Sequence, residues 1–86
     1  MVSKTWTYKE LTDTAALQIG RCATQAAAHV AEGDRAFARR YAEWAYGVCE
    51  LWREQTRGCH VAEDLERLIE AVYAVERIAD QSVSNA

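Results

Sequence analysis

Apolar residues recur along this chain every three or four positions, the repeat of an amphipathic α-helix. The repeat is interrupted at Gly33 and Gly58, and the chain contains no proline. Helices commonly end at a glycine in the left-handed conformation. The pattern therefore predicts three helices, over residues of about 8–32, 35–57 and 61–80.

Polar residues at the expected starts support these boundaries. Thr7 and Glu10 have the spacing of a capping box, in which each side chain bonds to the other residue's backbone amide. Trp6 and Leu11 flank this box with the spacing of a hydrophobic staple. Asp34 is a good N-cap for the second helix. Short connections between such helices predict a compact all-α bundle with up-down-up topology.

Apolar stripes predict which helix faces form the core. The third segment has a heptad-like stripe of Val61, Leu65, Leu68, Val72, Val75 and Ala79. The second has a similar stripe of Phe37, Tyr41, Trp44, Val48 and Leu51. Beside it lies a second set of Ala38, Ala42, Ala45, Cys49 and Trp52. The alanine-rich first segment has a stripe of Ala15, Ile19, Cys22, Ala26 and Val30. We expect these stripes to meet in the core, but periodicity alone does not decide which aromatic residues stay outside.

Two glycines inside the predicted helices have matching positions. Gly20 precedes the first connection by about as many residues as Gly47 follows it. In an antiparallel hairpin they would lie at the same height. Because glycine destabilises a helix interior by about 1 kcal/mol relative to alanine, the pair suggests a close backbone approach or space for an aromatic ring. Coincidence is the other interpretation.

Composition indicates one small domain over residues 1–86, with an extended lead at 1–6 and a frayed polar tail at 81–86. Hydrophobic residues make up 50% of the chain and charged residues 27%, which excludes a disordered chain. We expect a cytoplasmic protein, because no segment has the apolar length of a membrane span and the amino terminus lacks a signal-peptide core. The odd number of three cysteines favours reduced thiols.

Residues with catalytic or metal-binding chemistry are sparse. Cys59 and His60 are adjacent, but no further cysteine or histidine has the spacing of a metal site. The same pair makes a poor nucleophile and base, because neighbouring side chains rarely point at each other and no third group orients them. We therefore expect neither an enzyme, nor a cofactor, nor a metal site.

Charged residues give little support for nucleic-acid binding. The net charge is −3, and several arginines of the second segment lie three or four residues from Glu43, Glu50 or Glu54. This spacing predicts a salt-bridged face, so a nucleic-acid-binding regulator is a distant alternative. The third segment carries six acidic residues against two arginines, which would steer the protein to a basic partner.

The apolar arcs of the second and third segments are wider than a three-helix core requires. Either the alanine-rich first helix packs closely enough to bury both arcs, or part of them forms an interface. Exposed apolar patches on small proteins usually mark partner sites. We expect binding of another protein, through residues predicted as anchors and as a charged rim: Trp44, Tyr46, Trp52, Tyr73, Arg39, Arg40, Arg53, Glu66 and Glu70.

The function predicted from these features is stoichiometric inhibition or adaptation without chemistry. Small acidic helical proteins are common among phage and mobile-element inhibitors of host complexes, including anti-CRISPR proteins. That expectation rests on the class of molecule and on no motif. The alternative is a self-associating structural or regulatory bundle, in which a homodimer covers the surplus surface.

Overall fold

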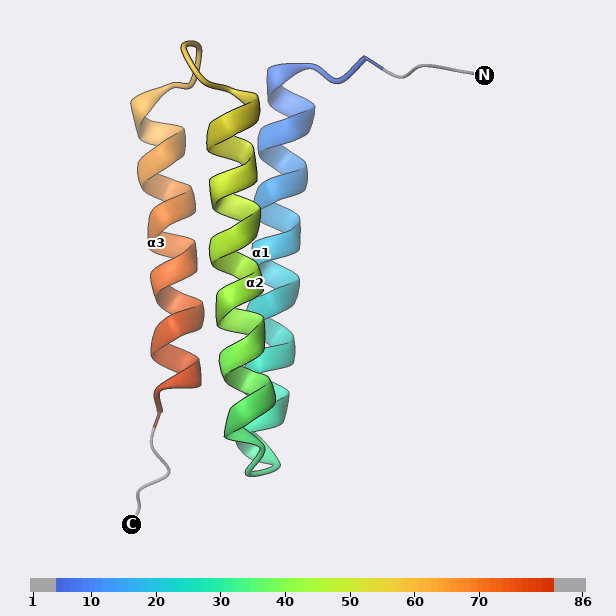
Figure 1. Ribbon diagram of the computed structural model, residues 1–86, viewed down its shortest axis with the longest axis vertical. Helices are drawn as coiled ribbons and strands as arrows, with labels where there is room; N and C mark the ends of the chain where they lie inside the picture. The colour runs from blue at the N-terminus through green and yellow to red at the C-terminus, as the bar shows by residue number, and fades with distance from the viewer. Residues whose placement is uncertain (1–4, 82–86) are drawn as a thin grey trace.

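The structure, a computed structural model, describes residues 5–81. Within this range the chain forms α1 (Tyr8–Ala31), α2 (Arg35–Gln55) and α3 (Ala62–Ala79), which run alongside one another in alternating directions (Figure 1). Each helix contacts both of the others, so they enclose one core. This confirms the all-α, up-down-up bundle. Most of the predicted lead at 1–6 and tail at 81–86 lies outside the described residues.

Local contacts set the beginnings of the first two helices. The Thr7 hydroxyl accepts a hydrogen bond from the Glu10 amide at 3.1 Å, and the Thr7 amide donates to the Glu10 carboxylate at 3.0 Å. The carboxylate of Asp34 accepts from the Phe37 amide at 3.1 Å. Both predicted caps are therefore confirmed.

The two connections contain the predicted left-handed glycines, since φ is 81° at Gly33 and 85° at Gly58. Helix α2 ends two residues earlier than predicted. The backbone leaves the helical conformation at Thr56 and enters a turn, in which the Cys59 amide donates to the Thr56 carbonyl at 2.9 Å.

Buried apolar side chains from all three helices form the core. The predicted stripes of α1 and α3 supply Ala15, Ile19, Cys22 and Ala26, together with Leu68, Val72, Val75 and Ala79. The ends of these stripes are less covered, with Val30 and Leu65 half-buried and Val61 exposed. Burial raises the pKa of both Cys22 and Cys49, whose thiols are free.

Helix α2 buries the stripe that begins at Ala38. The heptad-like stripe that begins at Phe37, which we predicted to face the core, was therefore the wrong one. The buried residues of α2 are Ala38, Ala42, Ala45, Cys49 and Trp52. The predicted stripe lies about one residue further round, leaving Phe37, Trp44 and Leu51 exposed. Small side chains on α1 and α2 face each other along most of this contact, so the two helices pack closely there and the larger stripe stays at its edge. Trp52, at the end of the buried stripe, is the one large ring among its five residues.

The predicted role of the mid-helix glycines is wrong. Gly20 and Gly47 are both exposed. A Cβ atom added to either would have no described atom within 4 Å, apart from its own helix backbone and chain neighbours. Neither position marks a close approach of helices or a space reserved for a ring.

Candidate functional site

Trp52, predicted as a partner-binding anchor, is instead the largest side chain of the core, with 1% of its surface exposed. Its indole nitrogen donates to the Thr12 hydroxyl at 2.9 Å, and Thr12 in turn donates to the Tyr8 carbonyl at 2.8 Å. A buried indole requires such a partner for its N–H group. Trp52 therefore joins α2 to α1 inside the core and is not the exposed anchor that we predicted.

Tyr8 connects the same end of the bundle to α3. Its hydroxyl donates to the Asp64 carboxylate at 2.7 Å and accepts from the Val61 amide at 2.9 Å. The hydrogen bond from Tyr8, with a second from Arg67, holds the pKa of Asp64 below its usual value. The ring of Tyr8 packs 6.1 Å from that of Trp52. These contacts connect Tyr8 of α1 to the start of α3 and to Trp52 of α2.

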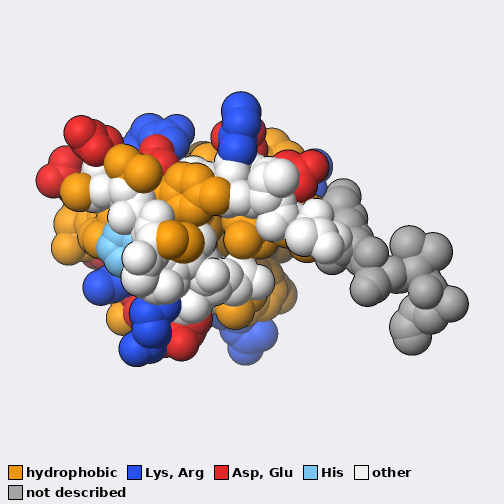
Figure 2. Space-filling model, turned by 90° about the horizontal axis from the view of Figure 1, so that it is seen from above, with side chains coloured by type: hydrophobic (Ala, Val, Ile, Leu, Met, Phe, Trp, Pro, Cys, Tyr) orange, Lys and Arg blue, Asp and Glu red, His pale blue; other side chains and the backbone are white. Residues whose placement is uncertain are grey.

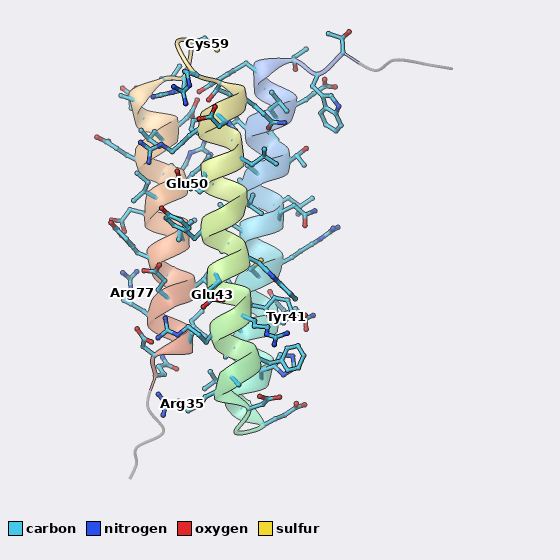
Figure 3. All side chains as sticks on the ribbon, viewed as in Figure 1. Arg35, Tyr41, Glu43, Glu50, Cys59 and Arg77 are labelled. Atoms are coloured by element: carbon cyan, nitrogen blue, oxygen red, sulfur yellow. The ribbon has the colours of Figure 1, made fainter. Side chains whose placement is uncertain are left out.

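The remaining predicted anchors are exposed but lie on two different faces. Trp44 and Tyr46 are two residues apart, which on a helix turns them about 200° from each other. Tyr46 lines a depression with Tyr73 between α2 and α3, whereas Trp44 contacts Tyr41 on the side toward α1. Figure 3 shows the division, with Tyr41 on one side of α2 and Glu43 and Glu50 on the other. The predicted residues therefore do not form one site.

The face between α2 and α3 carries both signs of charge. Arg53 pairs with Glu50 at 3.2 Å beside Tyr46 and Tyr73. Arg39 forms an ion pair with Asp80 and lines a neighbouring depression with Glu43 and Glu76. Glu66 and Glu70 are exposed further along α3. The predicted rim residues other than Arg40 lie on this side or on α3.

The face between α1 and α2 carries a continuous series of ring contacts. The rings of His29 and Phe37 stack with centroids 5.0 Å apart, and those of His29 and Tyr41 at 5.7 Å. Tyr41 then meets Trp44 edge-on at 4.7 Å. The Arg40 guanidinium lies 5.5 Å from the Phe37 ring centre, a cation–π contact. We call the stripe of Phe37, Tyr41, Trp44, Val48 and Leu51 the aromatic face.

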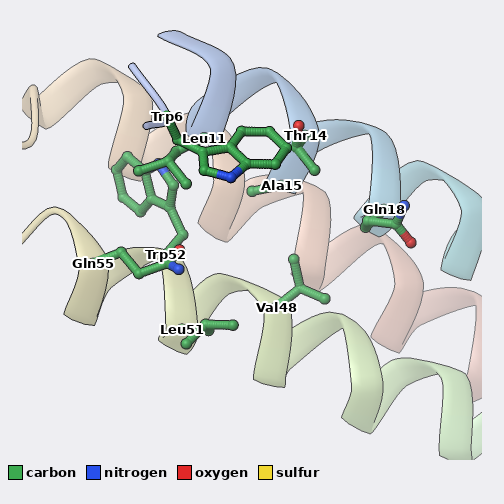
Figure 4. A pocket seen from close by; sticks show the side chains of 9 residues that line it. All are labelled: Trp6, Leu11, Thr14, Ala15, Gln18, Val48, Leu51, Trp52 and Gln55. Carbon is green, nitrogen blue, oxygen red and sulfur yellow. The ribbon is translucent and has the colours of Figure 1, made fainter. Parts of the chain in front are cut away.

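Beyond Trp44 the aromatic face continues into a depression of about 340 Å³ between α1 and α2. Its apolar walls are Trp6 and Leu11 on one side and Val48 and Leu51 on the other (Figure 4). Trp6 and Leu11 thus lie together, as the staple spacing predicts.

Trp52 and Ala15 also contribute to this depression, and its polar lining residues are Thr14, Gln18 and Gln55. In the view from above, hydrophobic side chains reach the surface between groups of charged ones (Figure 2). The described residues that line the depression are therefore all apolar or uncharged polar ones.

Sequence periodicity placed most of this surface in the core. Phe37, Tyr41, Val48 and Leu51 belong to the stripe that we expected to be buried, and only Trp44 was proposed as an anchor. One signal in the chain was informative: the parallel stripe of alanines on α2 matches the alanine-rich α1. Two helices with matching small residues can pack closely and exclude their larger neighbours.

Other chemistry finds little support in residues 5–81. No cluster of three or more metal-ligating side chains occurs there. Cys59 is exposed, while the ring of His60 packs 5.7 Å from that of Trp52. No helix within this range is long and apolar enough to cross a membrane.

Comparison with known proteins adds no family. No family model, curated protein or solved structure shows a significant match to this chain.

Proposed function

We propose that this protein is a non-catalytic protein-binding module that acts as an adaptor or stoichiometric inhibitor. The observation that carries the proposal is the row of exposed large side chains on α2, including Trp44 with 50% and Leu51 with 59% of their surfaces accessible. Apolar patches of this kind mark interaction sites, and Trp, Tyr and Arg contribute most of the binding energy at interfaces.

The regular secondary structure of the scaffold supports this proposal. The exposed residues of α2 project from a regular helix packed on both other helices. Binding through such a surface does not require a segment to become ordered, which lowers the entropic cost of association. Such a surface is better suited to binding another protein than to catalysing a reaction.

The arginines give less support to nucleic-acid binding. Arg53 and Arg57 pair with Glu50 and Glu54, and Arg39 pairs with Asp80. Arg40 points about 100° away from Arg39 around the helix and lies over the Phe37 ring. A continuous basic stripe that could follow a phosphate backbone is therefore not formed by these residues.

We also propose a biological context for this function. An inhibitor of a host defence complex such as CRISPR–Cas, encoded by a phage or mobile element, is one form that such a module takes. The small size, acidity and helical fold support it as a class. The free thiols of Cys22, Cys49 and Cys59 fit a reducing compartment such as the cytoplasm.

Site-specific photo-crosslinking in the native cell tests the proposed function. A photoreactive phenylalanine analogue would replace Trp44, Leu51, Tyr46 or Tyr73 one at a time, with Arg57 as an exposed control in the α2–α3 connection. We expect one defined crosslinked species, separate from the protein itself, from one or more of the four positions. Crosslinking no stronger than at Arg57 from all four would contradict the proposal.

A further inference from the structure

The aromatic face and its depression differ in charge from the rest of the surface. The depression beside Leu51 has no charged residue among its described lining residues. The neighbouring hollow on α1 has Arg21 as its one charged lining residue, together with Tyr41. The depressions between α2 and α3, by contrast, mix arginines with glutamates. The surface between α1 and α2 is thus apolar, neutral and edged by arginine.

Two arginines on this side are available to a partner. Within residues 5–81, neither Arg21 nor Arg40 forms an ion pair, and Arg40 instead lies over the Phe37 ring. Asp34, in the connection at one end of the face, already caps α2 through its bond to Phe37. Asp34 also lies 3.7 Å from His29 Nδ1, so the carboxylate at this end of the face already has contacts. Although the net charge of the protein is −3, this apolar surface therefore has two arginines beside it that pair with no described carboxylate.

We infer that the aromatic face binds an amphipathic helix of a partner protein, in which acidic residues flank the apolar stripe. This inference rests on the proposed function and specifies the surface and the partner's chemistry. From Phe37 to Leu51 the face extends over about 21 Å of helix rise, which a partner helix of about 14 residues would cover. Apolar side chains repeating every three or four residues would lie along it, the mode known as helix in groove.

The depression supplies a place for one anchoring side chain. Trp6, Leu11, Val48 and Leu51 surround a space that a large apolar residue of the partner would fill. Acidic residues on the partner's flank would meet Arg21 and Arg40, which contribute mainly to orientation and association rate.

Charge distinguishes this occupant from a second copy of the chain. A symmetric dimer brings the same patch together twice. The arginines of each copy would then face a surface that lacks carboxylates among its described lining residues, with like charges brought closer. An acidic helix would form ion pairs with those arginines. A second copy of the chain, bound through the same face, would not.

A displayed library of helical peptides tests the inference without knowledge of the natural partner. Peptides of about 16 residues, with apolar and flanking positions both randomised, would be selected on the full chain. We expect enriched sequences with apolar residues at helical spacing and Asp or Glu beside them. The affinity of one selected peptide, labelled with fluorescein, is then measured by anisotropy.

Matched variants locate the binding surface. Trp44→Ala and Leu51→Glu should each weaken the peptide at least about tenfold, and Arg21→Glu with Arg40→Glu should weaken it more at low salt than at high salt. Tyr46→Ala and Tyr73→Ala are controls of similar exposure on the other face, with 55% and 50% accessible, and should change affinity less than about twofold. Circular dichroism verifies that each variant is folded.

Several results would overturn the inference. They are a library without helical enrichment, a basic consensus, binding lost in the tyrosine variants but kept in Trp44→Ala, or a dimer of the wild-type chain that Leu51→Glu dissociates. Photo-crosslinks confined to Tyr46 and Tyr73 would preserve the proposed function while rejecting this surface. Absence of crosslinks from all four positions would remove the proposed function itself, whatever the peptides do.

Discussion

Trp44 and Trp52 belong to adjacent stripes of the same helix, yet they have different environments. Trp52 turns toward α1, where the Thr12 hydroxyl accepts its N–H group and Tyr8 packs on its ring. Trp44 turns about 80° away and stays half exposed. The Thr12 hydroxyl thus satisfies the N–H group that burial of Trp52 removes from water.

Replacing the two tryptophans should separate these roles by stability. We expect Trp52→Ala to lower the free energy of unfolding by about 3–5 kcal/mol, through loss of a fully buried ring. Trp52→Phe should cost about 1–3 kcal/mol, because Thr12 loses its donor. Trp44→Ala should stay within about 1 kcal/mol. Urea denaturation measures all three, and equal losses for the two alanine variants would contradict the assigned burial.

Asp64 should make the free energy of unfolding decrease as the pH becomes acidic. Its folded pKa is lowered, first by the Tyr8 hydroxyl and then by Arg67, so its contribution to stability is present above the unfolded value, near 3.8. That contribution is lost as the pH falls from this value through the folded pKa. We expect Tyr8→Phe to destabilise the protein more at neutral pH than near pH 2. Denaturant unfolding at both values measures the difference, and an equal effect would exclude this linkage.

Helix α2 has two apolar stripes, and packing chooses between them. Alanines at 38, 42 and 45 face the core, while the larger stripe remains at the edge of α1. Close packing brings more atoms into van der Waals contact than aromatic spacers would allow. This choice leaves the aromatic face available at the surface.

Replacing a glycine by alanine should change the free energy of unfolding in opposite directions inside a helix and in a connection between helices. Gly20→Ala should raise the free energy of unfolding by about 0.5–1 kcal/mol, because the site is helical and has space for a Cβ atom. Gly33→Ala should lower it by about 1–2 kcal/mol, because φ is 81° there. Thermal and urea unfolding of both variants provide the comparison. A loss of stability in Gly20→Ala would indicate a close contact at that position.

The whole molecule has an apolar face on one side and mixed charges on the other. Because the apolar face bears arginines but no carboxylate among its described lining residues, two copies should not associate through it. A monomer with this surface remains available to a partner.

We therefore expect a monomer throughout a hundredfold range of concentration, measured by light scattering after size exclusion. Leu51→Glu, which changes a side chain with 59% of its surface exposed, should leave both mass and fold unchanged. A stable dimer would contradict this expectation. It would favour the alternative from the sequence, in which the aromatic face mediates self-association.

Helix number, direction and most boundaries follow from the sequence alone, because they depend on contacts within a few residues. Thr7 with Glu10, Asp34, and the glycines at 33 and 58 act on their immediate neighbours, and each was predicted correctly. The buried stripes of α1 and α3 also followed from periodicity. In α1 the sequence has a second stripe of small residues beside the buried one, at Ala16, Gly20, Ala23, Ala27 and Ala31.

The surface for binding depended on contacts between residues distant in the chain. Which stripe of α2 is buried depends on how closely α1 approaches, and Trp52 is buried because Thr12 lies 40 residues earlier beside it. Neither relation is visible in the periodicity of one helix. Local physics thus determines the three helices, and the packing between them determines that Trp44 and Leu51 face outward while Trp52 does not.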